Sequence, residues 1–319
     1  MSQTVRGRYA PSPTGELHLG NVRTALVAWL ATRAAGGVFV MRVEDLDPPR
    51  ILPGAEERLL EDLRWLGLDW DEGPDVGGPY APYRQSERYP RYREALERLA
   101  EAGRVYGCTC SRADLRRLAS APHQGEEGPI YPGICRERGL PMDFGATGSG
   151  RCPALRFLAA PGTVCFEDLL AGRTCEDVQS QTGDFVLRRA DGLYAYQLAV
   201  VVDDGAMAIN QVVRGADLLG STPRQIQLQE ALGLPRPAYA HVPLVLNAEG
   251  ERLAKRDQAV SIRRLREGGS RPEDLIGELG ASLGLLPKPE PLTARELVDT
   301  FAWERVRREP WRVAPPAFS

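Results

Sequence analysis

The sequence predicts an α/β fold built on a parallel sheet, interrupted by an inserted α+β module and followed by a short helical tail. A strand, loop, helix and strand succession opens the chain over residues 4–47, and a second α/β succession resumes near residue 200. The segment between them starts near residue 106, carries the cysteines and interrupts this α/β pattern. We therefore predict that it is an insertion. With 319 residues, 43% of them hydrophobic, the chain is long enough to bury such a core.

The opening elements follow from apolar patterning and glycine stops. Residues 4–10 predict a strand, and residues 22–35 predict a helix that ends at Gly36 and Gly37. The run 37–47 predicts the next strand, so the unit is βαβ with a parallel, right-handed crossover. Ligands of such sheets bind at the carboxyl ends of the strands. Packing helices are expected at 55–68 and 86–103.

The later elements continue the same pattern. We expect a strand at 196–204, a strand and helix within 208–234, and strand-like runs at 241–247 and 253–262. Two Ser/Thr-x-x-Glu capping boxes, at Ser270 and Thr293, predict two tail helices. The resulting domains are a split α/β domain (1–105 and 200–262) whose halves share one sheet, an insertion (106–199) and a helical tail (263–319).

Charge, termini and cysteines narrow the function classes. A net charge of −3 gives no global argument for nucleic-acid binding, although arginine clusters could supply a local one. The first residues lack the apolar core of a signal peptide, and no apolar run approaches the roughly 20 residues of a membrane helix, so we expect a cytoplasmic protein without membrane contact. The six cysteines then favour thiols or a metal site over a disulfide framework.

A histidine turn and a distant lysine indicate nucleotide chemistry. His18, Gly20 and Asn21 stand just before the first helix, where glycine lets the backbone approach a phosphate and helix-start amides favour an anion. Lys255 and Lys288 are the only lysines among 40 basic residues. Codon bias could leave Lys255 by chance, and an isolated loop histidine is usually ordinary. The sequence contains neither GxGxxG nor GxxxxGK[ST], which disfavours dinucleotide-binding and P-loop sites.

The motifs together resemble the glutamyl branch of the class I aminoacyl-tRNA synthetases. "RYAPSPTGELHLGNVRTAL", "VMRVEDLDPPR", "YQLAVVVDD", "VVRGADLL" and "RLAKRDQAVSI" match in order over residues 8 to about 262. The family lysine is flanked by serine, whereas Ala254 and Arg256 flank Lys255 here. The resemblance implies a Rossmann-like catalytic domain that uses ATP with Mg²⁺. His18 and Lys255 would be catalytic, and both would bind ATP with Gly20 and Asn21.

The amino-acid site can be read from the charges of the implied substrate. L-Glutamate carries two carboxylates and one ammonium, which call for arginines and one acid. Arg8 and Arg214 suit carboxylates and Glu44 suits the ammonium. Taken singly, such arginines usually solvate a surface. The resemblance implies a glutamate site formed by Arg8, Tyr9, Ala10, Pro11, Ser12, Glu44, Tyr196 and Arg214.

Cysteines of the insertion suggest a zinc site. Cys108, Cys110 and Cys135 offer thiolates at short spacing, which suits tetrahedral Zn²⁺. Chemistry alone leaves the fourth ligand open between Tyr131 and His123, and the resemblance favours Tyr131. Three unligated thiols in one loop are the alternative. Cys152, Cys165 and Cys175 lack such spacing, and we expect them to be small apolar fillers.

The acceptor expectation rests on the resemblance. Only 57 residues follow Ile262, fewer than the anticodon-reading region of full-length family members, so we expect no anticodon-binding domain. Truncated members place glutamate on queuosine, the modified wobble base of tRNA(Asp). The insertion would then face the anticodon stem-loop, whose splayed bases a pocket can read. Alternatives are 3′-end aminoacylation with a partner protein, a small-molecule nucleotidylyltransferase, and a silent tRNA-binding relative. We expect a monomer.

Overall fold

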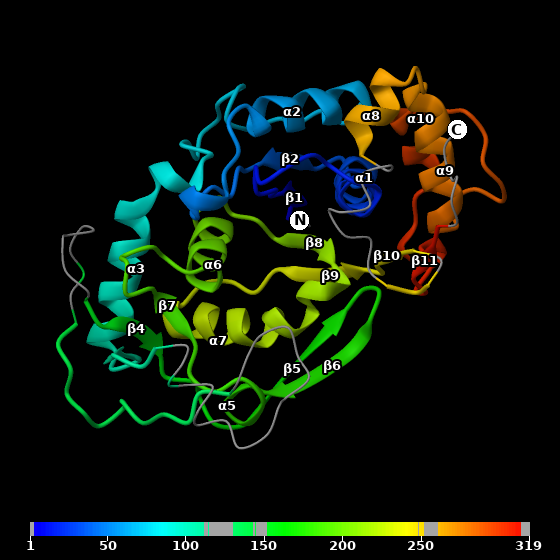
Figure 1. Cartoon of the computed structure of the whole chain (residues 1–319). Helices are drawn as coiled ribbons and strands as arrows, with labels where there is room; N and C mark the ends of the chain where they lie inside the picture. The colour runs from blue at the N-terminus through cyan, green and yellow to red at the C-terminus, as the bar shows by residue number, and fades with distance from the viewer. Residues whose placement is uncertain are drawn as a thin grey trace.

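The computed structural model of the chain describes residues 3–111, 114, 130–142, 144, 152–247, 249–251 and 261–313. Within these residues the central sheet has six strands in the order β2-β1-β8-β9-β5-β6 (Figure 1). The neighbours β2, β1, β8 and β9 pair in parallel, so the two predicted halves of the chain share one sheet. The strands are β1 (Arg6–Tyr9), β2 (Val38–Met41), β5 (Thr163–Asp168), β6 (Gly172–Asp177), β8 (Gln211–Gly215) and β9 (Ala238–Val242).

Helices cover both faces of the sheet. Side chains alternate between the faces of a strand, and Val213 and Ala240 share a core cluster with the first helix, α1 (Leu19–Ala34). Their neighbours Val212 and Tyr239 instead pack with Ile226 of α7 (Thr222–Leu232). The predicted α/β class is therefore confirmed.

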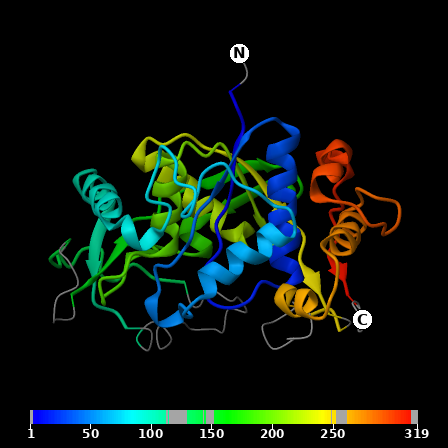
Figure 2. The ribbon, with the colours of Figure 1, turned by 90° about the horizontal axis from the view of Figure 1, so that it is seen from above.

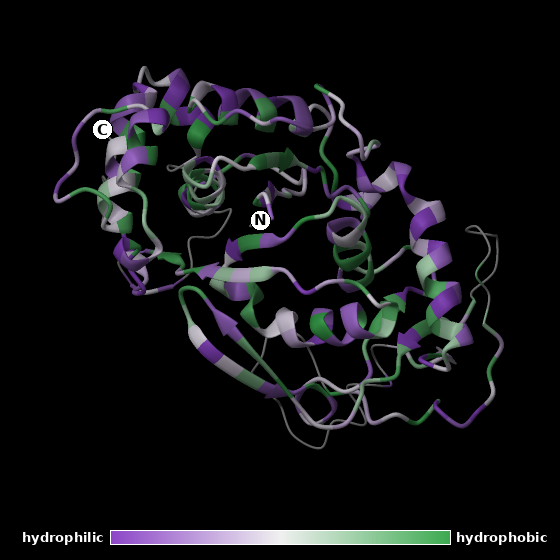
Figure 3. Cartoon of the chain, turned by 180° about the vertical axis from the view of Figure 1, so that it is seen from behind, coloured by the Kyte–Doolittle hydropathy of each residue, from purple (hydrophilic) through white to green (hydrophobic). Residues whose placement is uncertain are grey.

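Close contact between β1 and α1 depends on a glycine. A Cβ added at Gly7 would overlap the hydroxyl of Thr32 on α1. Because α1 is buried on all sides, it lacks the apolar stripe of a surface helix. In Figure 2 it runs between the sheet and the C-terminal helices. By contrast, α2 (Ala55–Trp65) and α3 (Tyr89–Glu101) carry hydrophilic residues along their outer sides (Figure 3).

The strand predicted at 196–204 is wrong, because these residues form helix α6 (Tyr196–Ala206). All residues from Leu198 to Asp204 are buried, so the helix shows no amphipathic period. A short, fully buried apolar run cannot be assigned to strand or helix by periodicity alone. The helix carries Asp203 and Asp204 into a cluster of buried arginines, and this tertiary pairing overrides the β propensity of its valines.

The predicted insertion contributes to two sheets. β3 (Val105–Cys108), β4 (Ala154–Phe157) and β7 (Val186–Arg188) form a separate antiparallel sheet. The hairpin of β5 and β6 instead extends the central sheet, where β5 pairs in parallel with β9. A short helix, α5 (Val178–Gln181), follows the hairpin. The boundaries of the insertion at 106–199 stay a prediction.

Two of the cysteines expected to be apolar fillers form a disulfide. Cys165 on β5 and Cys175 on β6 are direct register partners, with their Cα atoms 4.1 Å apart, and their sulfurs are bonded. The expectation for this pair was wrong because sequence spacing does not show that a hairpin brings the two residues opposite each other. Cys152 is partly exposed and is not part of a disulfide.

The C-terminal region packs against α1 instead of standing apart. Its helices are α8 (Ile262–Glu267), α9 (Pro272–Leu283) and α10 (Ala294–Leu297), and β11 (Trp311–Arg312) pairs with β10 (Val245–Leu246). Thr293 and Glu296 form the predicted capping box, but the box predicted at Ser270 is wrong, since α9 starts at Pro272 with Arg271 as its N-cap. Across the described residues, every helix is too short or too polar to traverse a bilayer.

Candidate active site

A cavity of about 480 Å³ opens where the carboxyl ends of β1 and β8 meet the start of α1. This is the position at which parallel sheets bind ligands. Every described residue that the sequence predicts for the glutamate and ATP sites lines this cavity. These residues are Arg8, Tyr9, Ala10, Pro11, Ser12, His18, Gly20, Asn21, Glu44, Tyr196 and Arg214.

His18 is the N-cap of α1, so its imidazole stands at the positive end of the helix. The Asn21 amide oxygen accepts a hydrogen bond from the His18 backbone N–H at 3.2 Å and fixes this turn. A Cβ added at Gly20 would lie 3.2 Å from His18 Cε1, so glycine leaves room for the ring. The arrangement provides helix-start amides and one imidazole for an anionic group.

Lys255 lies outside the described residues, which stop at Glu251 and resume at Ser261. Ser261 forms an isolated antiparallel bridge with His18, and the Ile262 backbone N–H donates to the Leu17 carbonyl at 2.9 Å. The chain that follows residues 252–260 is therefore fixed beside the histidine turn. The role of Lys255 stays a prediction.

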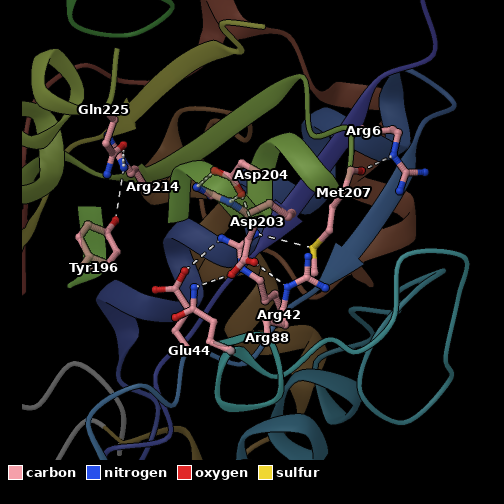
Figure 4. A network of polar contacts seen from close by, with 12 residues as sticks. Arg6, Arg42, Glu44, Arg88, Tyr196, Asp203, Asp204, Met207, Arg214 and Gln225 are labelled. Carbon is pink, nitrogen blue, oxygen red and sulfur yellow. Dashed lines mark hydrogen bonds and ion pairs between the residues drawn. The ribbon is translucent and has the colours of Figure 1, made fainter. Parts of the chain in front are cut away.

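A buried network of charges adjoins the cavity through Arg8 and Glu44, and Figure 4 shows most of its members. Arg8 donates to both carboxylate oxygens of Asp204 at 3.3 Å, and Arg42 donates to Asp204 at 2.7 Å. Arg42 also donates to Glu44 at 3.1 Å, while Asp203 accepts from Arg88 at 2.6 Å. Each charge in this chain faces an opposite charge, as buried ions require.

Glu44 is the carboxylate of this network that lines the cavity. Burial raises the pKa of Glu44 above its ordinary range, although the positive charges of Arg42 and Arg8 act in the opposite direction. An ammonium group bound beside Glu44 would favour its charged form. This environment is compatible with the predicted contact to the substrate ammonium.

Arg214 is held on several sides. It is 5% exposed, and its guanidinium donates to Thr222 at 2.8 Å. The same guanidinium donates to Gln225 at 2.8 Å and to Tyr196 at 3.3 Å (Figure 4). It also donates to His241 at 3.0 Å. A guanidinium fixed in this way offers a set geometry to a carboxylate in the cavity.

The sequence did not predict three residues that orient Arg8, Glu44 and Arg214. Asp204, Arg42 and His241 do not belong to the predicted site, yet each contacts a predicted member of it. His241 offered one signal: it is one of three histidines and begins the predicted strand-like run 241–247. Asp204 ends the run that the sequence predicts as a strand, so its contacts with Arg8 and Arg42 could not be predicted.

The predicted zinc ligands that the structure describes converge near the end of β3, in the region of the separate sheet β3-β4-β7, which we call the small module. The sulfur atoms of Cys108, Cys110 and Cys135 all lie within 4.8 Å of one another. The Tyr131 hydroxyl is 3.5 Å from the Cys108 sulfur and accepts from the Cys135 backbone N–H at 3.0 Å. Tetrahedral zinc with Zn–S bonds of about 2.3 Å needs sulfurs about 3.8 Å apart, so the residues fit this ion. His123 lies outside the described residues.

The thiols of this cluster differ in pKa: burial raises the pKa of Cys110 to about 12, whereas that of Cys135 is lowered. Burial alone would raise the pKa of the Cys135 thiol, but hydrogen bonds from Tyr131 and the neighbouring groups lower it to about 7. The guanidinium of Arg156 lies over the Tyr131 ring at 3.9 Å from its centre. Thiolate, the metal-binding form of cysteine, is thus accessible at Cys135. The fourth ligand stays a prediction.

Comparison with known proteins decides the family. Residues 4–314 match the model of the class I tRNA synthetases for glutamate and glutamine (E and Q), catalytic domain. The chain belongs to this family. Class I synthetases are ATP-using ligases, so the cavity at the start of α1 is part of a synthetase domain.

Relatives and solved structures agree with this family. The chain is 52% identical to glutamyl-Q tRNA(Asp) synthetase of Symbiobacterium thermophilum, over 96% of this chain and 95% of the relative. It is 43% identical to a glutamate–tRNA ligase of Dehalococcoides mccartyi, over 97% of this chain but 62% of that relative. A crystal structure of a glutamate tRNA ligase from Elizabethkingia meningosepticum superposes with a TM-score of 0.79 at 29% identity, covering 97% of this chain and 67% of that one.

A second, larger cavity of this synthetase domain joins the first. It measures about 1590 Å³ and reaches from the active site to Cys108, Cys110 and Tyr131 of the small module. The two cavities share Ser12, Glu44, Arg50 and Tyr196. Its lining mixes arginines, among them Arg189 and Arg224, with carboxylates such as Asp47 and Asp191, so it offers volume and polar groups of both charges beside the glutamate site.

Proposed function

We propose that this synthetase domain activates L-glutamate with ATP and transfers the glutamyl group to queuosine at the wobble position of tRNA(Asp). The observation that carries the proposal is the convergence of Arg8, Glu44, Arg214 and His18 on one cavity. Two cationic groups and one carboxylate match the charges of glutamate, and the helix start beside them suits the phosphates of ATP.

In this proposal, activation depends on positioning and charge. A glutamate carboxylate oxygen forms a bond to the α-phosphorus of ATP, the bond from that phosphorus to the bridging oxygen breaks, and pyrophosphate leaves. His18 and Lys255 stabilise the negative charge that develops on the phosphoryl oxygens. A lysine on a flexible stem can follow this charge, whereas the planar fork of arginine fixes one geometry.

Transfer then uses a hydroxyl of the queuosine ring. Its oxygen forms the ester bond with the activated carbonyl, and AMP leaves with the former carboxylate oxygen. The large cavity that shares Tyr196 with the glutamate site supports entry of a nucleoside from the side of the small module. We propose that residues 106–199 contact the anticodon stem-loop there.

Two ions complete the proposal. Mg²⁺ accompanies ATP and neutralises part of the phosphate charge. Cys108, Cys110 and Cys135, with Tyr131 as the fourth ligand, hold a structural Zn²⁺ that fixes the loops of the small module. An enzyme of this kind works where tRNA is found, in the cytoplasm.

The choice of acceptor is supported by the relatives. Identity to the glutamyl-Q tRNA(Asp) synthetase of Symbiobacterium thermophilum is 52%, against 43% to the glutamate–tRNA ligase of Dehalococcoides mccartyi. The test is transfer of radiolabelled glutamate to three RNAs: queuosine-containing tRNA(Asp), the same tRNA without the modification, and tRNA(Glu). We expect label only on the first.

Other outcomes point to other functions. Label on the 3′ end of tRNA(Glu) would make the protein a 3′-aminoacylating enzyme and overturn the queuosine proposal. Absence of glutamate-dependent pyrophosphate exchange, with and without tRNA, would remove glutamate activation itself and favour a small-molecule nucleotidylyltransferase.

A further inference from the structure

His241 links the proposed glutamate-binding Arg214 to a buried carboxylate. Arg214 on β8 and His241 on β9 are register partners in adjacent parallel strands. Arg214 Nε donates to His241 Nε2 at 3.0 Å, and the other ring nitrogen, Nδ1, lies 2.6 Å from Asp168 at the end of β5. Three neighbouring strands thus supply one hydrogen-bonded chain.

The geometry fixes the protonation state of the ring. A guanidinium nitrogen can only donate, so His241 Nε2 must be the acceptor and Nδ1 must carry the hydrogen. That hydrogen points at Asp168, which accepts it. Burial and the charge of Arg214 hold the pKa of His241 below its ordinary value, although Asp168 acts in the opposite direction, which agrees with a neutral ring.

Both carboxylate oxygens of Asp168 accept hydrogen bonds. The side chains of Asp168 and His241 are both 0% exposed. One carboxylate oxygen accepts from the backbone N–H groups of Leu170 at 2.9 Å and Ala171 at 2.8 Å, and the other accepts from the imidazole. The carboxylate therefore cannot turn away from the ring without losing several hydrogen bonds.

We infer that Asp168 and His241 are positioning residues for glutamate recognition: Asp168 selects the Nδ1–H tautomer of His241, and this tautomer holds Arg214 toward the cavity. The inference rests on the proposed function, since it assumes that Arg214 binds a carboxylate of glutamate. Neither Asp168 on β5 nor His241 on β9 lines the glutamate cavity itself, so both would act on glutamate through Arg214.

Asp168→Asn separates this role from simple packing. The amide has nearly the same shape, and its oxygen still accepts from Leu170 and Ala171. Its NH₂ group now faces His241 Nδ1, so the ring hydrogen moves to Nε2 and opposes the donor Nε–H of Arg214. The same exchange of tautomer underlies the aspartate-to-asparagine effect in serine proteases.

The kinetic test uses glutamate-dependent pyrophosphate exchange with tRNA present. Asp168→Asn should raise the KM for glutamate by about 10- to 100-fold, as expected for an opposed buried hydrogen bond, and leave the KM for ATP unchanged. His241→Phe, which keeps a ring but removes the acceptor, should act in the same way and serves if Asp168→Asn fails to fold. Glu72→Gln is the matched control, because Glu72 is also a buried partner of an arginine, Arg6, but lies outside the cavity lining.

A tautomer measurement gives a readout that packing alone would not change. The chain has three histidines, so ¹⁵N NMR of the imidazole nitrogens is tractable, with His18 and His123 assigned by substitution. His241 should show a protonated Nδ1 in the native protein and a protonated Nε2 in Asp168→Asn. This spectrum needs no substrate and does not depend on activity.

The outcomes are distinct. An active native enzyme with an unchanged glutamate KM in Asp168→Asn and His241→Phe would overturn the positioning role, as would an equal rise in both KM values. An Nε2–H tautomer in the native protein would also overturn it. Complete absence of glutamate-dependent exchange in the native protein would instead remove the proposed function, and the positioning role with it.

Discussion

Arg8 donates through two of its nitrogens to the carboxylate of Asp204, which lies 196 residues further along the chain. The pair crosses from β1 to α6, and both side chains are less than one-tenth exposed. Arg42 shares the same carboxylate at 2.7 Å. A residue that lines the glutamate cavity is thus oriented by a helix that the sequence patterns suggested was a strand.

Asp204→Asn should destabilise the fold, because it leaves Arg8 and Arg42 buried with less opposing charge. Breaking a buried ion pair costs about 3–5 kcal/mol, and we expect a loss of this size in the free energy of unfolding measured with urea. Glu230→Gln, which removes the exposed partner of Arg236, should change it by less than about 1 kcal/mol. Equal effects of the two changes would contradict the role of the network.

The contribution of Asp204 should also depend on pH. Burial would raise the pKa of Asp204, but the charges of Arg8 and Arg42 hold it below its ordinary value. The unfolded chain therefore binds a proton at a higher pH than the folded chain. The stabilisation is fully present above about pH 3.9, the unfolded value, and is lost as the pH falls through the lower folded value. The difference between native protein and Asp204→Asn should shrink in that acidic range.

His18→Ala and Lys255→Arg should each lose most pyrophosphate exchange while ATP binding largely survives. His18→Ala removes the imidazole, and Lys255→Arg keeps the charge but fixes one geometry, so each weakens stabilisation that is strongest in the transition state, worth about 10²- to 10³-fold in rate. Exchange kinetics and equilibrium ATP binding measure the two effects separately. Lys288→Arg is the matched control for the lysine. Near-native exchange in either site variant would remove that residue from the proposed mechanism.

Arg214→Ala should abolish glutamate activation. It removes a buried, preorganised guanidinium from the cavity wall, and we expect a fall in kcat/KM for glutamate of at least about 100-fold. Arg236→Ala, at an exposed arginine that does not line the cavity, should leave the value unchanged. Thermal unfolding shows whether the variant is folded. A folded Arg214→Ala with native glutamate affinity would show that the assignment is wrong.

Zinc content tests the thiolate cluster. Protein purified without added metal should contain about one zinc per chain by elemental analysis, and Cys135→Ser should lose most of it. Cys152→Ser changes a cysteine that is neither disulfide-bonded nor part of the cluster, and it should keep the metal. A native content well below one zinc per chain would count against the site.

Thiol titration tests the hairpin disulfide. Protein denatured without reductant should react at four thiols, those of Cys108, Cys110, Cys135 and Cys152. Six reactive thiols would mean that Cys165 and Cys175 are reduced. If the bond is present, Cys165→Ser should lower the free energy of unfolding by up to about 2–3 kcal/mol, because a closed loop restricts the unfolded chain.

Local chemistry made much of the site predictable. Arg8 and Glu44 lie near the carboxyl ends of predicted strands, and His18 stands just before the first predicted helix. Parallel strands bring such boundaries to one edge of a sheet, so their proximity follows from the order of elements. The capping box at Thr293 was predictable for the same local reason, since its partners are three residues apart.

The sequence by itself determined the parallel α/β class, the position of the histidine turn and the kind of side chains around the cavity. Only the tertiary structure decided that residues 196–206 form a helix, that Cys165 meets Cys175, and that Asp168 reaches Arg214 through His241. The physical reason is the range of the forces involved. Periodicity and capping act within a few residues, whereas a buried charge takes its partner from whichever strand or helix the packed core places beside it.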